Sequence, residues 1–143
     1  MFEGSLQGVE KSLRALREAR PDDEMHLPGV ETVEDCLSGL EMGYGVGAGC
    51  CRCMAEDGVA FNITAAAGGL SHSKVDLKLS EHSLDKSPLC GAAGSCGCLA
   101  CEDGLSRAYV SHLVKNGEMM GKISIMQHNL WQLCMAAEAA RKK

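Results

Sequence analysis

The sequence SCGCLACEDGLSRAYVSHL, residues 95–113, places three cysteines within six positions, at Cys96, Cys98 and Cys101, just before a helical pattern. A Cys-x-Cys-x-x-Cys loop confines three sulfur atoms to a small space, where all of them can contact a single ion. Zinc is bound by four ligands in a tetrahedron and favours thiolate and imidazole donors. The stretch therefore predicts one structural Zn²⁺, whose fourth ligand comes from elsewhere in the chain.

The candidates for this fourth ligand are His112, His128, Cys90 and Cys134. His112 lies on the helix directly behind the loop and is expected to face the helical core. His128 belongs to the following helix, which can fold back over the loop after a turn. Spacing favours His128 only slightly, so the choice stays open at this point. The alternative interpretation is that the thiols pack as small hydrophobic side chains without a metal ion.

The other cysteines are interpreted differently. The chain has nine cysteines, an odd number, and no secretory signal is recognised. Close clusters of cysteines then indicate metal ligands rather than disulfides. A second group, formed by Cys50, Cys51 and Cys53, has no clear partner in the sequence, and we interpret its members as buried or free thiols.

Length and charge narrow the classes of protein that fit this sequence. The 143 residues suit one domain, and 19 acidic against 14 basic residues give a net charge of −5. Such a balance gives no overall case for nucleic-acid binding. No apolar run approaches the roughly 18 residues needed to cross a bilayer. We therefore expect no membrane span and a cytoplasmic location, with mitochondrial association as an open alternative.

The first half of the chain alternates predicted helices and strands. Apolar spacing predicts a helix over 10–20, and a short apolar run predicts a strand over 25–30. Thr32, with Asp35 three residues later, resembles an N-cap, and the helix behind it is expected to end at Gly43. The glycine-rich run that follows is expected to be a strand. This order is typical of a parallel sheet.

The second half is expected to hold two short strands and then two helices. The strands are predicted over 58–63 and 75–79, with a loop over 64–73. A helix from Leu105 should present one apolar face, and a second helix should follow the Asn116-Gly117 turn. The methionine-rich stripe of this second helix is predicted to be core. The apolar face of the first helix comprises Leu105, Ala108, Tyr109, His112 and Leu113. The stripe of the second helix comprises Met119, Met120, Ile123, Leu130, Leu133, Cys134 and Ala137.

The C-terminal motifs together resemble the zinc-binding segment of the tRNA-guanine transglycosylases, also called queuine tRNA-ribosyltransferases. The resemblance rests on the Cys-x-Cys-x-x-Cys loop, on Ser106-Arg107-Ala108-Tyr109, on Glu118 and on His128-Asn129-Leu130. It implies that His128 completes the zinc site. An extra residue before Ser106 departs from the family pattern. Upstream, HLPGVETVEDCLSGLEMGYGV is similar to a strand-loop-helix segment of the family, and FEGSLQGVEKSLRAL resembles the family's accessory subunit more than its catalytic one.

The resemblance also implies a fold and a division of the chain. The expected fold class is α/β, with the incomplete C-terminal part of a TIM (β/α) barrel and a zinc-binding subdomain with C-terminal helices. Residues 1–63 would be the partial barrel, 64–94 a loop and short strand that connect, and 95–143 the zinc loop and helical module. A closed barrel needs about eight strands, so the barrel segment is expected to pack on another chain, to rearrange, or to be part of a longer protein.

The residue expected to catalyse the family's reaction is missing from this sequence. Catalytic members of the family carry an aspartate that attacks the ribose at the end of the last barrel strand. That position falls at Ala48, between Gly47 and Gly49. A methyl group cannot act as a nucleophile, and only Arg52 could replace the family's basic segment. A cysteine nucleophile has no evident base nearby. We therefore expect no catalytic residue and no organic cofactor.

The favoured interpretation is a non-catalytic transglycosylase-like subunit or fragment. It would support a catalytic transglycosylase subunit in a heterodimer, as an accessory to queuosine modification of tRNA, and would contact tRNA only indirectly. One alternative is a degenerate transglycosylase remnant that serves as a structural subunit of a larger complex. A second alternative is one part of an active transglycosylase. The sequence leaves these alternatives open.

Overall fold

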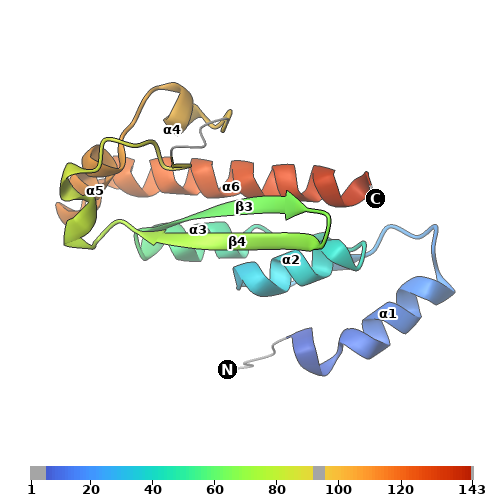
Figure 1. The fold of residues 1–143 in the computed structure, drawn as a ribbon. Coiled ribbons are helices and arrows are strands. Elements are labelled where there is room, and N and C mark those ends of the chain that lie inside the picture. The colour runs from blue at the N-terminus through green and yellow to red at the C-terminus, as the bar shows by residue number, and fades with distance from the viewer. Residues whose placement is uncertain (1–5, 92–95, 143) are drawn as a thin grey trace.

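A computed structural model describes residues 6–91 and 96–142 (Figure 1). The chain combines helices and strands, as the predicted α/β class requires. A long hairpin lies at the centre, and the C-terminal helix runs beside it (Figure 1). Helices α2 (Val33–Glu41) and α3 (Gly49–Glu56) pack below the hairpin, and the shorter α4 (Leu99–Glu102) and α5 (Arg107–Lys115) lie at one end. No helix of the described residues is long and apolar enough to cross a membrane.

The first half forms the predicted βα unit. A 3-10 turn η1 (Leu6–Gly8) precedes α1 (Glu10–Ala19), and strand β1 (His26–Leu27) pairs in parallel with β2 (Gly45–Val46) around α2 (Val33–Glu41). These strands are only two residues long, and they form the one parallel pairing in the described parts of the chain. The incomplete barrel therefore remains an expectation.

The predicted start and end of α2 are confirmed. The Thr32 hydroxyl accepts a hydrogen bond from the Asp35 backbone nitrogen at 3.1 Å, which satisfies one free donor of the first turn. Gly43 follows the helix with a φ angle of +83°, where a residue with a Cβ would be strained. The helical arrangement of this segment is therefore predictable from local chemistry alone.

The two central strands differ from the predicted ones, because they pair through most of residues 64–73 and the second strand ends at Asp76, three residues before its predicted end. Strands β3 (Val59–Ala66) and β4 (Gly69–Asp76) are antiparallel, and their register runs from the pair Val59–Asp76 to the pair Ala66–Gly69. The predicted loop over 64–73 is wrong, because most of it is paired. Alanine, glycine and serine have low β propensity, which hides the strands from sequence analysis. A 3-10 segment, η2 (Ser80–Leu84), follows β4.

A helix replaces the predicted end of the glycine-rich strand. The prediction of an extended run over 44–50 is wrong at its C-terminal end, because α3 (Gly49–Glu56) begins immediately after Ala48. The strand before it is β2 alone. Apolar residues alternate with glycine in this run, which is typical of a strand, although its last residues are helical. Ala48 becomes the residue that precedes the first turn of a helix.

The C-terminal helices lie where they are predicted, with a different buried face. A short helix α4 (Leu99–Glu102) precedes α5 (Arg107–Lys115) and α6 (Met119–Arg141). In α5 the buried residues are Val110 and Ser111, whereas Tyr109 is 50% exposed. The predicted apolar face of this helix is therefore wrong by about one position. The Ser106 hydroxyl accepts a hydrogen bond from the Tyr109 backbone nitrogen at 3.2 Å and caps α5.

The methionine stripe of α6 is not core. Met119 is 73% exposed and Met120 is 58% exposed, and further large apolar residues of the helix also face solvent. The other exposed ones are Ile123, Met126, Leu130, Trp131 and Met135. The core instead uses mainly the opposite face, including Ile125 and Ala136, and Leu133 is the one residue of the predicted stripe that is fully in the core. Since α6 is apolar on both faces, the apolar pattern alone does not identify the buried one.

Side chains of α6 close the free edge of β3. The Asn129 side chain accepts a hydrogen bond from the Phe61 backbone nitrogen at 3.0 Å and donates one to the Val59 carbonyl at 3.1 Å. The Gln132 side chain accepts one from the Ile63 backbone nitrogen at 3.0 Å. These backbone groups do not point to β4. Helix α6 therefore takes the place that a third strand would otherwise fill.

Candidate metal centre

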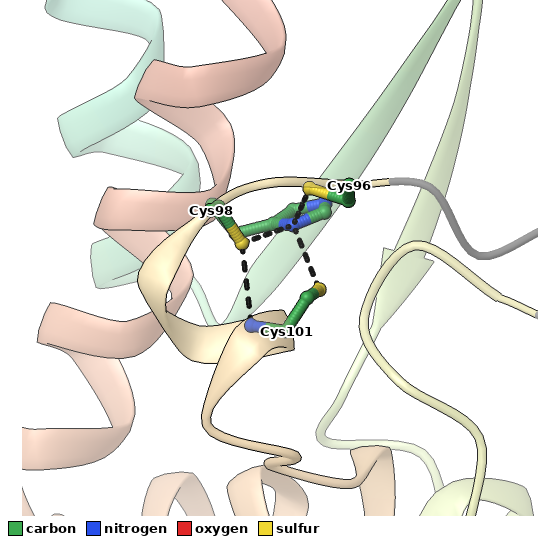
Figure 2. A group of neighbouring side chains, drawn as sticks. Cys96, Cys98 and Cys101 are labelled. Carbon is green, nitrogen blue, oxygen red and sulfur yellow. Dashed lines mark hydrogen bonds between the residues drawn. The ribbon is translucent and has the colours of Figure 1, made fainter.

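Local structure brings the three cysteines of the loop together (Figure 2). Cys98 caps α4, because its sulfur accepts a hydrogen bond from the Cys101 backbone nitrogen at 3.4 Å. Cys101 lies in the single turn of helix that follows, so both sulfur atoms face the same side. A Cβ atom at Gly97 would lie 2.8 Å from the Trp131 ring. Glycine at this position therefore lets the loop approach α6.

His128 of α6 faces these three sulfur atoms. Its Nδ1 atom lies 3.6 Å from the Cys96 sulfur, 3.4 Å from that of Cys98 and 3.7 Å from that of Cys101. The four donor atoms all lie within 4.8 Å of one another. His128 is fully buried, and the cysteines are buried or partly buried. The structure thus brings together all four residues that the sequence analysis named.

The arrangement fits a tetrahedral metal ion. For metal–sulfur and metal–nitrogen bonds of about 2.3 and 2.05 Å, a tetrahedron has nitrogen-to-sulfur edges of about 3.6 Å. The observed distances from Nδ1 to the sulfur atoms, 3.4 to 3.7 Å, bracket this value. The residues present therefore suit a metal ion bound by three sulfurs and one nitrogen. This is the one such group of donors among residues 6–91 and 96–142.

The remaining candidates for the fourth ligand lie outside this group. His112 is exposed and lies against Asn116, the residue that follows the end of α5. Cys134 is also exposed. Cys90 is near enough to affect the Cys101 thiol, but it does not belong to the four-donor group. The structure therefore selects His128 from the alternatives that spacing had left open.

Burial sets the protonation of these donors when no cation is bound. Desolvation lowers the pKa of His128 to about 4, so its imidazole is neutral near pH 7 and Nδ1 can offer a lone pair. Desolvation raises the pKa of the Cys98 and Cys101 thiols. Three buried thiolates would be unfavourable alone, and a divalent cation would offset their charge.

Two polar side chains contact the donors from behind. The Nε2 atom of His128 lies 3.2 Å from Oδ1 of Asn62, in β3. The Gln132 side chain donates a hydrogen bond to the Cys96 sulfur at 3.5 Å. Neither residue can be predicted from the sequence, because neither belongs to a motif and Asn62 is 66 positions from His128.

Comparison with known proteins identifies the family. The family described as "TGT: Queuine tRNA-ribosyltransferase" matches residues 2–143. The chain belongs to the queuine tRNA-ribosyltransferase family. A relative from Thermus thermophilus, named queuine tRNA-ribosyltransferase, is 35% identical over 134 residues, which are 94% of this chain. A relative of the same name from Neisseria meningitidis is 35% identical over 131 residues, or 88% of the chain.

The match covers a limited part of these relatives. The aligned residues make up 31% of the Thermus protein and 32% of the Neisseria protein. The chain therefore spans about a third of the length of the curated relatives it matches. The family match over residues 2–143 shows that the similarity extends beyond the C-terminal motifs to nearly the whole chain.

The segment where the resemblance places the family's nucleophile has no carboxylate in this chain. Ala48 is the residue before α3 and makes no side-chain capping hydrogen bond. Arg52, on the first turns of α3, pairs with Glu56 at 2.9 Å on an exposed surface. The guanidinium and the nearest downstream carboxylate thus neutralise each other away from Ala48.

The second thiol group lies largely in the core. Cys50 and Cys51 are fully buried, and Cys36 of α2 joins them, with its sulfur 3.3 Å from that of Cys50. Hydrogen bonds from the Cys36 and Cys51 thiols lower the pKa of Cys50. Cys53 is only partly buried. The interpretation of Cys50 and Cys51 as buried thiols is confirmed. The spacing of cysteines along the sequence does not indicate that Cys36 joins this group.

Proposed function

We propose that this chain acts as a non-catalytic, transglycosylase-like subunit or fragment that supports a partner through its metal and helical module. The proposal rests on two features that occur together in this chain. The four donors of the metal centre are assembled, while Ala48 occupies the position that the resemblance assigns to the nucleophile. The proposed likeness to the family's accessory subunit rests on the segment FEGSLQGVEKSLRAL, residues 2–16.

The proposed metal is one structural Zn²⁺. Three thiols and an imidazole are the donors that zinc favours, and four protein ligands complete its tetrahedron. A closed site has no open position for water or substrate, so the ion would stabilise the fold rather than take part in a reaction. It would join the loop at Cys96, Cys98 and Cys101 to α6, through His128.

The proposed division of the chain follows from this arrangement. Residues 95–143 would form the zinc and helical module, residues 1–63 a partial (β/α) barrel segment, and residues 64–94 the connection. The parallel pair β1–β2 supports a barrel-like beginning. A closed barrel needs about eight strands, and this pair would form one part of it.

A partner is proposed to cover the exposed face of α6. A helix that is apolar all round is normally buried, yet in the described residues the outer side of α6 is solvent-exposed over most of its length. Met119, Met120 and Trp131 are exposed by 73%, 58% and 37%. The favoured partner is a catalytic transglycosylase subunit in the cytoplasm, and other subunits of a larger complex are the alternative. Contact with tRNA would be indirect.

Base exchange tests this proposal. Labelled guanine is offered to tRNA with the purified chain alone, with a catalytic transglycosylase such as the Thermus relative as positive control. We expect no incorporation by the chain alone, because a methyl group at position 48 cannot form the covalent intermediate. Turnover by the chain alone, or a covalent adduct between tRNA and this chain, would contradict the proposal. Affinity purification from the native cell then separates a transglycosylase partner from a larger complex.

A further inference from the structure

The ring of His128 is held on both sides. Its Nδ1 atom faces the three sulfur atoms, and its Nε2 atom lies 3.2 Å from Oδ1 of Asn62. The two contacts come from opposite directions, one from the cysteine loop and one from β3. His128 is fully buried, so water does not compete for either nitrogen.

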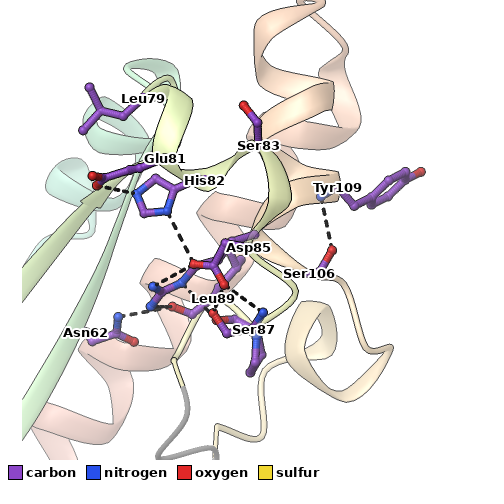
Figure 3. Close-up of polar contacts among 12 residues, drawn as sticks. Asn62, Leu79, Glu81, His82, Ser83, Asp85, Ser87, Leu89, Ser106 and Tyr109 are labelled. Carbon is purple, nitrogen blue, oxygen red and sulfur yellow. Dashed lines mark hydrogen bonds and ion pairs between the residues drawn. The ribbon is translucent and has the colours of Figure 1, made fainter.

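The orientation of the Asn62 amide follows from its second partner. Its Nδ2 atom donates a hydrogen bond to the carbonyl oxygen of Leu89 at 3.3 Å. Since a carbonyl can only accept, the NH₂ group has to face Leu89 and the oxygen has to face the histidine ring. Figure 3 shows Asn62 beside Leu89.

The contact between this oxygen and His128 requires one particular tautomer of the histidine. Oδ1 of Asn62 accepts a hydrogen bond only if Nε2 of His128 carries the hydrogen. The lone pair is then on Nδ1, which faces the sulfur atoms of Cys96, Cys98 and Cys101. Metal-binding histidines commonly donate their other ring N–H to an oxygen of this kind, which fixes the ring and raises ligand basicity.

We propose that Asn62 is a positioning residue of the metal centre, which holds His128 with Nε2 protonated and Nδ1 directed at the metal. The proposal rests on the zinc site proposed above. It adds a residue from β3 to a site otherwise built from the cysteine loop and α6, and so connects metal binding to the central hairpin.

The Leu89 carbonyl, which orients the Asn62 amide, is itself held in place by a second hydrogen bond. The Leu89 carbonyl also accepts a hydrogen bond from the Arg107 guanidinium at 3.3 Å, and the same guanidinium lies 3.4 Å from the Asp85 carboxylate. Leu89 is fully buried. The carbonyl that orients the amide is therefore held by a network that spans the segment after η2 and the first turn of α5 (Figure 3).

Substitutions at Asn62 separate positioning from simple packing. Asn62→Leu keeps the size of the side chain and removes both hydrogen bonds. Asn62→Asp keeps an oxygen acceptor for Nε2 of His128 but cannot donate to Leu89. Asn62→Thr suits a strand and is too short to reach the ring. The control is Ser73→Ala, which changes the residue directly opposite Asn62 on β4 and leaves the metal donors untouched.

The measurement is the Zn²⁺ affinity of the full chain, obtained by competition with a chromophoric chelator, together with the melting temperature of the metal-free form. We expect Asn62→Leu and Asn62→Thr to weaken Zn²⁺ binding about 10- to 100-fold. Asn62→Asp and Ser73→Ala should stay within about threefold of the wild type. Since Asn62 is only partly buried, all the variants should fold.

The possible outcomes are distinct. Loss of affinity in the Leu and Thr variants with retention in Asn62→Asp supports the positioning role. Equal losses in Asn62→Leu and Asn62→Asp would overturn it, because the contact with Leu89 would then be what matters. Unchanged affinity in Asn62→Leu would overturn it as well. If the wild type itself binds no Zn²⁺, the proposed zinc site is wrong, which is a different result from either of these.

Discussion

The side-chain oxygen of Asn129 lies 3.0 Å from the backbone nitrogen of Phe61, so a residue of α6 takes the hydrogen bond that another strand would accept. The same side chain donates to the Val59 carbonyl, and Gln132 continues the pattern at Ile63. An exposed strand edge is a template for unwanted pairing. In this chain the helix that supplies the histidine of the metal centre also protects the hairpin.

Replacing Asn129 should therefore destabilise the chain strongly. In Asn129→Ala the buried Phe61 nitrogen and the partly buried Val59 carbonyl lose their partners, and a buried loss of this kind costs about 1–3 kcal/mol. We expect the free energy of unfolding in urea to fall by about 2–4 kcal/mol. Asn116→Ala, at an exposed turn, should cost less than about 0.5 kcal/mol. Similar values for the two variants would show that the strand edge does not depend on α6.

The cysteines of the two groups should differ in their effect on the C-terminal module. Cys101→Ser removes a donor of the proposed site, whereas Cys53→Ser changes a thiol that has no partner in the metal group. Because structural zinc contributes on the order of 10 kcal/mol to folding of its module, we expect Cys101→Ser to cost about 3 kcal/mol or more.

Hydrogen exchange localises this effect. Faster exchange over the described residues 96–142 in Cys101→Ser, with the Cys53→Ser profile unchanged, is the expected result. Equal effects of the two substitutions would contradict a metal-dependent module. Comparison with and without added Zn²⁺ serves as the internal control, because Cys101→Ser should not respond to the ion.

Asp85 should make stability depend on acidic pH. Hydrogen bonds from the hydroxyl and backbone nitrogen of Ser87 lower the pKa of Asp85 to about 2, below the value of about 3.9 for an unfolded chain. The carboxylate therefore stabilises the fold above about pH 4, and this contribution is lost as the pH falls through about 2.

Asp85→Asn tests this directly. The difference in unfolding free energy between wild type and variant should be largest above pH 4 and should shrink steadily towards pH 2. The comparison cancels effects of acid on the metal centre, which both proteins share. A difference that stays constant across this range would show that the carboxylate is not responsible.

The outer face of α6 should govern association. Met126 and Leu130 are 41% and 40% exposed and lie one helical turn apart. We expect the isolated chain to self-associate through this face, and the double variant Met126→Glu/Leu130→Glu to sediment as a smaller species. Lys122→Glu, a change at another exposed position of the same helix, should have little effect. A monomeric wild type by sedimentation would contradict an obligate partner.

Local chemistry explains which elements could be predicted from the sequence. The Thr32 cap, the Gly43 stop and the Cys-x-Cys-x-x-Cys loop each depend on residues within a few positions of one another. His128 needs the family resemblance, because spacing alone does not distinguish it from His112. The location of the fourth donor is a property of how α6 folds back.

Contacts between distant segments explain what the sequence does not reveal. Asn62 and His128 are 66 positions apart, and nothing in either neighbourhood indicates that they meet. The hairpin extends through a run of small residues because its strands pair with each other, despite weak intrinsic propensity. The exposed side of α6 is predicted to be core because it is as apolar as the buried side.

The metal content and coordination of the wild-type chain test the central claim most directly. The protein is purified without chelator, its zinc is measured by elemental analysis, and the ligands are counted by X-ray absorption at the zinc edge. We predict close to one equivalent of zinc with three sulfur neighbours at about 2.3 Å and one nitrogen at about 2.0–2.1 Å. Much less than one equivalent, or a shell made mainly of oxygen and nitrogen, would contradict the claim.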